Sequence, residues 1–206
     1  MSGVRIGIDF DNTIICYDEV FAAAARQRGL VPADWVGLKR ELRDYLRAKP
    51  GGELAWQGLQ GWVYGKGIKD AAVFHGLPGF LAACRQAAAS VYIVSHKTQY
   101  GHQDPDRTDL RLAARDWLRL SGLTGSADSA LSLDRIYFED TLAAKVDRVA
   151  SLDLDVFIDD LIDVFEQPHF PARTRAILFA GLDAARGARF RSAASWAEIQ
   201  NEVFAA

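Results

Sequence analysis

Four carboxylates and a hydroxyl group follow short apolar segments of this sequence. They belong to Asp9, Asp11, Asp159, Asp160 and Ser95. Clustered carboxylates repel one another and resist leaving water, so they need a cation or protons in order to lie together. Magnesium is a hard ion that prefers oxygen ligands and takes one or two carboxylates. With a lysine nearby, such a site suits a phosphoryl group, whose charge needs a metal and further cations around it.

The segments that precede these residues have the length and composition of buried strands. Each one is short, apolar and rich in β-branched or aromatic residues, which is typical of strands that are covered on both faces. The predicted strands are Val4–Ile8, Val91–Val94, Ile136–Phe138, Val156–Ile158 and Ala176–Phe179.

Helical patterns lie between the predicted strands. One covers Leu81–Ala89, and a second keeps helical spacing from Leu110 to Leu118. Thr141 is a candidate N-cap, and Ser195 with Glu198 fits a capping box that opens a last helix. Strands that alternate with helices predict an α/β fold with a doubly wound, mainly parallel sheet. Ligands of such sheets bind beyond the carboxyl ends of the strands, where the acidic residues are expected.

The stretch from about Ile14 to Phe74 interrupts this alternation, because it contains no clear strand and has helical spacing in two or three pieces. We interpret it as a small helical insertion after the first strand. Its aromatic residues are either the core of this insertion or a platform for a base or a sugar; the core is the favoured interpretation. They are Trp35, Tyr45, Trp56, Trp62 and Tyr64.

Three motifs of the chain resemble those of the haloacid dehalogenase-like superfamily. They are Ile8-Asp9-Phe10-Asp11-Asn12-Thr13, Val94-Ser95-His96 and Phe157-Ile158-Asp159-Asp160. The resemblance implies a Rossmann-like core made of residues 1–15 and 74–206, with residues 16–73 as a helical cap. It also implies Mg²⁺ as the cofactor and phosphatase chemistry, because the superfamily's phosphatases have Asp at the position of Asp11.

The same resemblance implies roles for single residues. Asp9 would be the nucleophile that forms an aspartyl-phosphate, and Asp11 the general acid and base. Asp9, the Asp11 carbonyl and Asp160 would bind the metal directly. Asp159 would lie next to these ligands without binding the metal, or would bind it through a water molecule. Ser95, Thr13 and the backbone amides around Phe10, Asp11 and His96 would hold the phosphate oxygens.

The lysine of the superfamily's third motif has two candidates. Lys145 stands at the start of the helix before the Asp159-Asp160 pair, where the superfamily places this residue, and it is the preferred catalytic and phosphate-binding lysine. Lys97, two residues after Ser95, is the rival. Many members of the superfamily have a further acidic residue after the Asp-Asp pair, one position later than Asp163 stands here. Whether Asp163 orients a metal-bound water is therefore left open.

Charge, cysteine spacing and the N-terminal segment bear on the protein's partners and on its compartment. The net charge is −3 with acids and bases well mixed, which gives no reason to expect nucleic acid or a membrane surface as a partner. Cys16 and Cys84 stand in unrelated contexts without the spacing of metal ligands. The N-terminus lacks the regions of a signal peptide, so we expect a cytoplasmic protein.

The expected activity is Mg²⁺-dependent hydrolysis of a small phosphomonoester, such as a sugar phosphate or a nucleotide. Two alternatives stay open. The first is an enzyme that transfers the phosphoryl group to an acceptor other than water or acts as a mutase. The second is a non-catalytic module that binds a phosphoester. The polar loop Tyr100–Thr108 either is a plain solvated loop, which is the favoured interpretation, or reaches the leaving group, with Arg107 contacting a second phosphate or carboxylate. Asn12 and Cys16 are further candidates for substrate contact.

Overall fold

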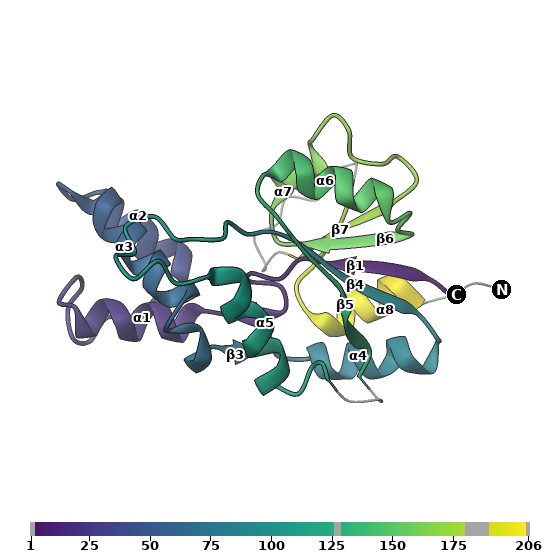
Figure 1. The fold of residues 1–206 in the computed structure, drawn as a ribbon, viewed down its shortest axis with the longest axis horizontal. Helices are drawn as coiled ribbons and strands as arrows, with labels where there is room; N and C mark the ends of the chain where they lie inside the picture. Colours follow the sequence, from purple (N-terminus) through teal and green to yellow (C-terminus); the bar gives the residue numbers. More distant parts are fainter. Residues whose placement is uncertain (1–2, 126–128, 180–189, 205–206) are drawn as a thin grey trace. The chain divides into compact units, whose positions relative to one another are not determined.

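A computed structural model describes residues 3–125, 129–179 and 190–204 (Figure 1). The chain divides into two compact units. The first, called the core unit below, consists of residues 1–15, 73–97 and 119–206, and the second, called the helical unit, of residues 16–72 and 98–118. No helix among the described residues is both long enough and apolar enough to span a membrane.

The core unit is built on a parallel sheet whose strands run in the order β5-β4-β1-β6-β7-β8. These strands are β1 (Arg5–Ile8), β4 (Ser90–His96), β5 (Leu131–Glu139), β6 (Val156–Asp159), β7 (Arg175–Phe179) and β8 (Arg191–Ala193). A separate pair, β2 (Ile15–Cys16) and β3 (Ala72–Val73), forms where the chain passes from one unit to the other. The predicted α/β class and parallel sheet are confirmed.

The register of the sheet aligns the ends of its central strands. Ile8 at the end of β1 pairs with Ile158 of β6 on one side and with Ile93 of β4 on the other. The Asp9 amide then donates to the Ile158 carbonyl at 2.9 Å, which extends the pairing by one residue. The polar residues that follow β1, β4 and β6 therefore meet at one edge.

Helices cover both faces of this sheet. Helices α6 (Leu142–Ser151) and α7 (Ile162–Phe165) lie on one face, and α4 (Leu77–Gln86) and α8 (Trp196–Phe204) lie on the other (Figure 1). Apolar side chains of α6 and α7 pack on the strands in one cluster of buried residues. Its members include Val94, Val146, Val149, Leu154, Phe157, Val164 and Phe165.

Two predicted helix starts can be compared with the structure. The prediction for Thr141 is confirmed, because its hydroxyl accepts from the Ala144 amide at 3.1 Å and caps α6. Ser195 accepts from the Glu198 amide at 3.2 Å, as expected of an N-cap. The second half of its capping box is wrong: the Glu198 carboxylate accepts from the Ala194 amide, one residue earlier than predicted.

The helical unit is an α-helical assembly around an aromatic core. It contains α1 (Asp18–Gln27), α2 (Lys39–Arg47), α3 (Gly52–Tyr64), the short 3₁₀ helix η1 (Ile68–Asp70) and most of α5 (Leu110–Leu120). Trp56 is buried and stacks on Phe21 with ring centroids 5.0 Å apart. Trp56 is thus part of the core of the unit, in agreement with the favoured interpretation of the aromatic residues.

Some predicted boundaries differ from the structure. The third predicted strand begins five residues earlier, at Leu131, and β8 was not predicted, because Arg191-Ser192-Ala193 has no apolar run. The helix expected over Leu81–Ala89 instead runs over Leu77–Gln86.

Residues 98–118 group with the helical unit rather than with the core to which the sequence assigned them. The assignment of a core domain and a cap domain stays a prediction.

Candidate active site

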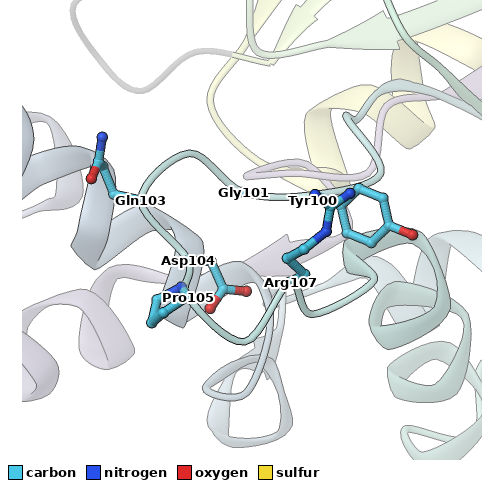
Figure 2. A pocket seen from close by; sticks show the side chains of 6 residues that line it. All are labelled: Tyr100, Gly101, Gln103, Asp104, Pro105 and Arg107. Carbon is cyan, nitrogen blue, oxygen red and sulfur yellow. The ribbon is translucent and has the colours of Figure 1, made fainter.

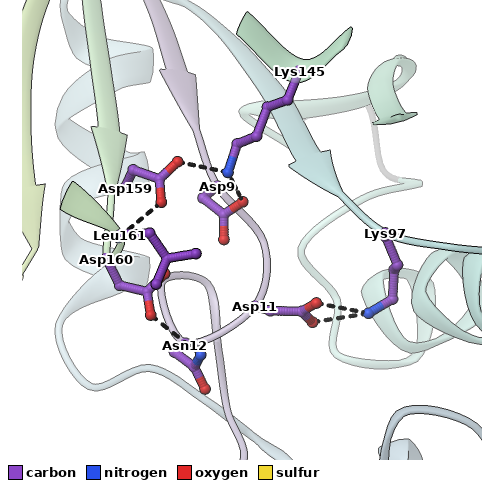
Figure 3. A network of polar contacts seen from close by, with 8 residues as sticks. All are labelled: Asp9, Asp11, Asn12, Lys97, Lys145, Asp159, Asp160 and Leu161. Carbon is purple, nitrogen blue, oxygen red and sulfur yellow. Dashed lines mark hydrogen bonds and ion pairs between the residues drawn. The ribbon is translucent and has the colours of Figure 1, made fainter. Parts of the chain in front are cut away.

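Three carboxylates lie together at the carboxyl ends of β1 and β6 (Figure 3). One ligand atom from each of Asp9, Asp159 and Asp160 lies within 4.8 Å of the other two. Asp9 and Asp159 are buried and Asp160 is half-buried, so water screens their mutual repulsion poorly. The arrangement therefore requires a cation or bound protons.

Lys145 supplies part of that charge. Its ammonium group lies 2.5 Å from Asp9 Oδ1 and 2.6 Å from Asp159 Oδ2 (Figure 3). Lys145 stands one turn after the N-cap Thr141, on the side of α6 that also buries Val146, and it is 1% exposed. The position of Lys145 in the first turn of α6 thus places a side chain that is usually exposed to solvent inside the carboxylate cluster.

Burial and neighbouring charges together raise the pKa values of Asp159 and Lys145. Burial, together with the negative charges of Asp9 and Asp160, raises the pKa of Asp159 to about 8 against the opposing effect of Lys145. Burial alone would lower the pKa of Lys145, but the attraction of Asp159 and Asp9 outweighs it and raises that pKa. One lysine therefore leaves this group of carboxylates under-neutralised.

Asp11 has a different partner. Both of its carboxylate oxygens accept from the Lys97 ammonium group, each at 2.9 Å. In Figure 3 the Asp11 side chain points toward Lys97, while Lys145 points toward Asp9 and Asp159. The two lysines that the sequence offered as rivals thus stand beside different aspartates.

The turn after β1 fixes the remaining residues of the first motif. The Phe10 carbonyl accepts from the Ile14 amide at 3.0 Å, which closes the turn. Asn12 adopts a left-handed conformation with φ of 59°, and its side-chain nitrogen Nδ2 donates to Asp160 Oδ2 at 3.2 Å. Thr13 is fully buried, and its hydroxyl has no hydrogen-bond partner among the described residues. Asn12 therefore orients a candidate metal ligand, a contact across 148 residues of sequence that no local motif indicates.

The predicted phosphate-binding residues of the second motif lie at the end of β4. Ser95 is buried, and its backbone pairs with Phe138 of β5. His96 is exposed, and its ring nitrogen Nε2 lies 3.1 Å from the Asp140 carbonyl. Phe10 is buried with its ring edge-on to Phe138, at a centroid distance of 5.8 Å. The Phe10 and His96 side chains therefore have structural contacts, and only their backbone amides stay candidates for phosphate.

Solved structures with the same fold match over nearly the whole chain. A HAD family hydrolase from Deinococcus radiodurans R1 with bound phosphate and sodium has a TM-score of 0.63 at 14% identity, with 98% of this chain and 95% of that chain covered. The putative HAD-hydrolase YfnB from Bacillus subtilis, bound to magnesium, has a TM-score of 0.60 at 11% identity and full coverage of both chains.

The chain has the haloacid dehalogenase-like (HAD-like) fold. Protein Tyrosine Kinase A of Mycobacterium tuberculosis is also similar in structure, with a TM-score of 0.60, 18% identity, and coverage of 100% of this chain and 99% of that chain. No protein-family model matches the sequence, and no curated protein matches it either. The fold is therefore established by structure at identities too low to carry over an activity.

The carboxylates of the HAD-like core unit fit a divalent cation. Three oxygen donors converge from two neighbouring strand ends, and hard oxygen donors are what Mg²⁺ prefers. Asp163 is not part of this group; it stands on the short helix α7 and its side chain is exposed. A role of Asp163 in orienting a metal-bound water stays a prediction.

The polar loop after Lys97 belongs to the helical unit and has a pocket of its own. Tyr100, Gly101, Gln103, Asp104, Pro105 and Arg107 line a cavity of about 350 Å³ (Figure 2). The Arg107 guanidinium lies over the Tyr100 ring, 4.5 Å from its centroid. Asp104 accepts from the amides of Asp106 and Thr108, which shapes the loop. Contact of this loop with a leaving group, and of Arg107 with a second phosphate or carboxylate, stays a prediction.

Proposed function

We propose that this protein is a Mg²⁺-dependent phosphatase that hydrolyses a small phosphomonoester through an aspartyl-phosphate on Asp9. The observation that carries the proposal is the convergence of Asp9, Asp159 and Asp160 around one point, with the Lys145 ammonium group between Asp9 and Asp159. A purely structural role would not require three carboxylates at this edge, because their burial costs free energy that one lysine offsets only in part.

The first chemical step falls to Asp9 and Asp11. An Asp9 carboxylate oxygen attacks phosphorus, the bond from phosphorus to the leaving oxygen breaks, and Asp11 gives a proton to that oxygen. Lys145 contacts Asp9 at 2.5 Å, so it orients the carboxylate and places positive charge beside the incoming phosphoryl group. Ser95, Thr13 and the amides around Phe10, Asp11 and His96 are proposed to hold the phosphoryl oxygens.

The second step releases inorganic phosphate. Asp11 accepts a proton from a water molecule, whose oxygen bonds to phosphorus as the bond between phosphorus and Asp9 breaks. Asp9 is thereby restored as a carboxylate. The buried hydroxyl of Thr13, which has no hydrogen-bond partner in the part of the chain that the structure describes, supports a place for phosphate oxygens near the first motif, because a buried polar group without a partner is costly.

Magnesium would be held by Asp9, Asp160 and the Asp11 carbonyl, with Asp159 beside it. When bound, the ion neutralises charge on the phosphoryl oxygens and keeps the carboxylates ionised. Asn12 donates to Asp160 at 3.2 Å and so fixes the orientation of that ligand. The magnesium and the phosphate bound to proteins of similar fold support the same chemistry here.

The decisive test is phosphate release from 4-nitrophenyl phosphate with and without Mg²⁺. We expect activity that requires the metal, and we expect Asp9→Asn to lower kcat by at least ~10³-fold, as loss of a nucleophile does. A phosphorylated Asp9 peptide, identified by mass spectrometry after rapid acid quench, would locate the intermediate. An Asp9→Asn protein that keeps its full turnover would refute the proposed mechanism.

Phosphotransfer to an acceptor other than water is the second candidate. It is favoured by one observation, the structural similarity to a chain described as a tyrosine kinase. Product analysis in the presence of alcohol or tyrosine-peptide acceptors distinguishes the two. Only a phosphatase releases one inorganic phosphate for every phosphomonoester consumed. Tight binding of a phosphoester without any turnover would instead indicate a binding module.

A further inference from the structure

A second ion pair, between the buried Lys97 and the half-buried Asp11, lies beside the carboxylate cluster, and the proposed chemistry gives Lys97 no role. The Lys97 ammonium group donates to both carboxylate oxygens of Asp11, at 2.9 Å each. The Lys97 side chain is 2% exposed and the Asp11 side chain is 19% exposed. A lysine so far from water is costly unless it is paired, so this contact has to be explained.

The backbone fixes Lys97 in place. It follows the last residue of β4, and its amide donates to the Glu139 carbonyl at the end of β5 at 2.9 Å. Its ammonium group also lies 5.3 Å from the centroid of the Phe10 ring, which is itself buried. The Lys97 backbone is therefore fixed at a strand end, and its buried side chain brings the charge to the Asp11 carboxylate.

The two buried lysines hold the two motif aspartates at separate places. Lys145 from α6 contacts Asp9, and Lys97 from the end of β4 contacts Asp11, so the side chains of these near neighbours in sequence diverge (Figure 3). A nucleophile and an acid/base group need separate positions, because one faces the phosphorus and the other faces the leaving oxygen. The pairing with Lys97 provides the second position.

We propose that Lys97 is the positioning residue for Asp11, which it holds where the carboxyl group meets the leaving oxygen of the substrate. The inference rests on the proposed phosphatase activity. Lys97 then acts on the reaction through Asp11, and this distinguishes it from Lys145, which contacts the nucleophile. It follows that the importance of Lys97 depends on how much the leaving oxygen needs a proton.

Leaving groups of different basicity make this dependence measurable. A 4-nitrophenolate ion departs readily without a proton, whereas an alkoxide departs poorly unless an acid protonates it. The ratio of kcat/KM for 4-nitrophenyl phosphate to kcat/KM for an alkyl phosphate therefore reports on the acid alone. Because kcat/KM covers only steps up to departure of the leaving group, slower hydrolysis of the aspartyl-phosphate does not affect this ratio.

The experiment measures this ratio for the unmodified protein and for Lys97→Met, a variant of similar length without the charge. General acids contribute about 10²- to 10⁴-fold, so a misplaced one should raise the ratio by about tenfold or more. Lys97→Arg, which keeps the charge with another shape, should raise it less. In an Asp11→Asn background, Lys97→Met should change the ratio no further.

The outcomes separate the inference from the proposed function. A ratio that changes less than fivefold in Lys97→Met, with both substrates losing rate alike, overturns the positioning role and leaves the phosphatase intact. Lys145→Met is the matched control, because it should slow both substrates alike. If Lys97→Met does not fold, the comparison of Lys97→Arg with the unmodified protein decides. Absence of turnover in the unmodified protein overturns both proposals.

Discussion

At the scale of single residues, the site depends on charge compensation by Lys145. Its ammonium group stands between Asp9 and Asp159, both of them buried, so truncation to methionine leaves carboxylates without a counter-charge. We expect Lys145→Met to lower the free energy of unfolding by about 3–5 kcal/mol in metal-free buffer. Urea denaturation measures this loss, and added Mg²⁺ should recover part of it.

The control for this variant is an exposed lysine in an ion pair. Lys66 lies 2.5 Å from Asp106 with both side chains more than half exposed, and such pairs contribute little to stability. Lys66→Met should therefore keep the unfolding midpoint of the unmodified protein. Equal midpoints for Lys145→Met and Lys66→Met would contradict the compensating role of Lys145.

Thr13 offers a prediction in which stability and binding change in opposite directions. Its hydroxyl is buried without a partner among the described residues, so Thr13→Val exchanges an unsatisfied group for an apolar one of the same shape. We expect the free energy of unfolding to stay equal or to rise by about 1 kcal/mol, because the unpaired group no longer has to be buried. If the hydroxyl binds phosphate oxygens, calorimetry with inorganic phosphate and Mg²⁺ should show weaker binding by about fivefold to tenfold. Unchanged phosphate affinity would remove Thr13 from the proposed site.

At the scale of elements, the sequence predicts what depends on local pattern. The central strands are short apolar runs followed by polar residues, so both the sheet and the edge that carries Asp9 and Asp159 could be predicted. The strand β8 could not, because Arg191-Ser192-Ala193 has no apolar run, although it pairs with β7 in the sheet. The pairing of Lys97 with Asp11 spans 86 residues, and no local spacing indicates it.

The grouping of residues 98–118 with the helical unit also has a cause that periodicity does not show. The loop after Lys97 packs against α3 where glycines let the two backbones approach: a Cβ atom at Gly101 would lie 2.7 Å from the Gly61 Cα atom. Close approach of this kind depends on which residues face each other across the unit. It becomes visible only once both segments are placed.

This contact predicts opposite effects for two glycine substitutions. Gly101→Ala should destabilise the protein by about 1–3 kcal/mol, since backbone atoms must move to admit the new methyl group. Gly58→Ala lies inside α3, where a Cβ atom would meet only Gln103 at 4.0 Å. It should stabilise by up to about 1 kcal/mol through helix propensity. Thermal unfolding of the two variants compares them, and a stabilising Gly101→Ala would contradict the packing described.

At the scale of the whole molecule, the carboxylate cluster links folding, pH and metal binding. Burial raises the pKa of Asp159 to about 8 in the folded protein, whereas an unfolded chain has an aspartate pKa of about 3.9. Between these values the folded state holds a proton that the unfolded state has lost. The stability that this group contributes is therefore present at low pH and is lost as the pH rises toward 8.

Magnesium should reverse this trend, because it binds the ionised carboxylates and must displace the proton on Asp159 at lower pH. We expect the rise in Tm caused by a fixed concentration of Mg²⁺ to be larger at pH 8 than at pH 6. The affinity should differ by about tenfold to 100-fold if one proton is displaced. Asp159→Asn carries no such proton, so its metal-dependent rise in Tm should vary less with pH. A rise that is the same at both pH values in the unmodified protein would show that the ion does not compete with this proton, and would place the metal away from Asp159.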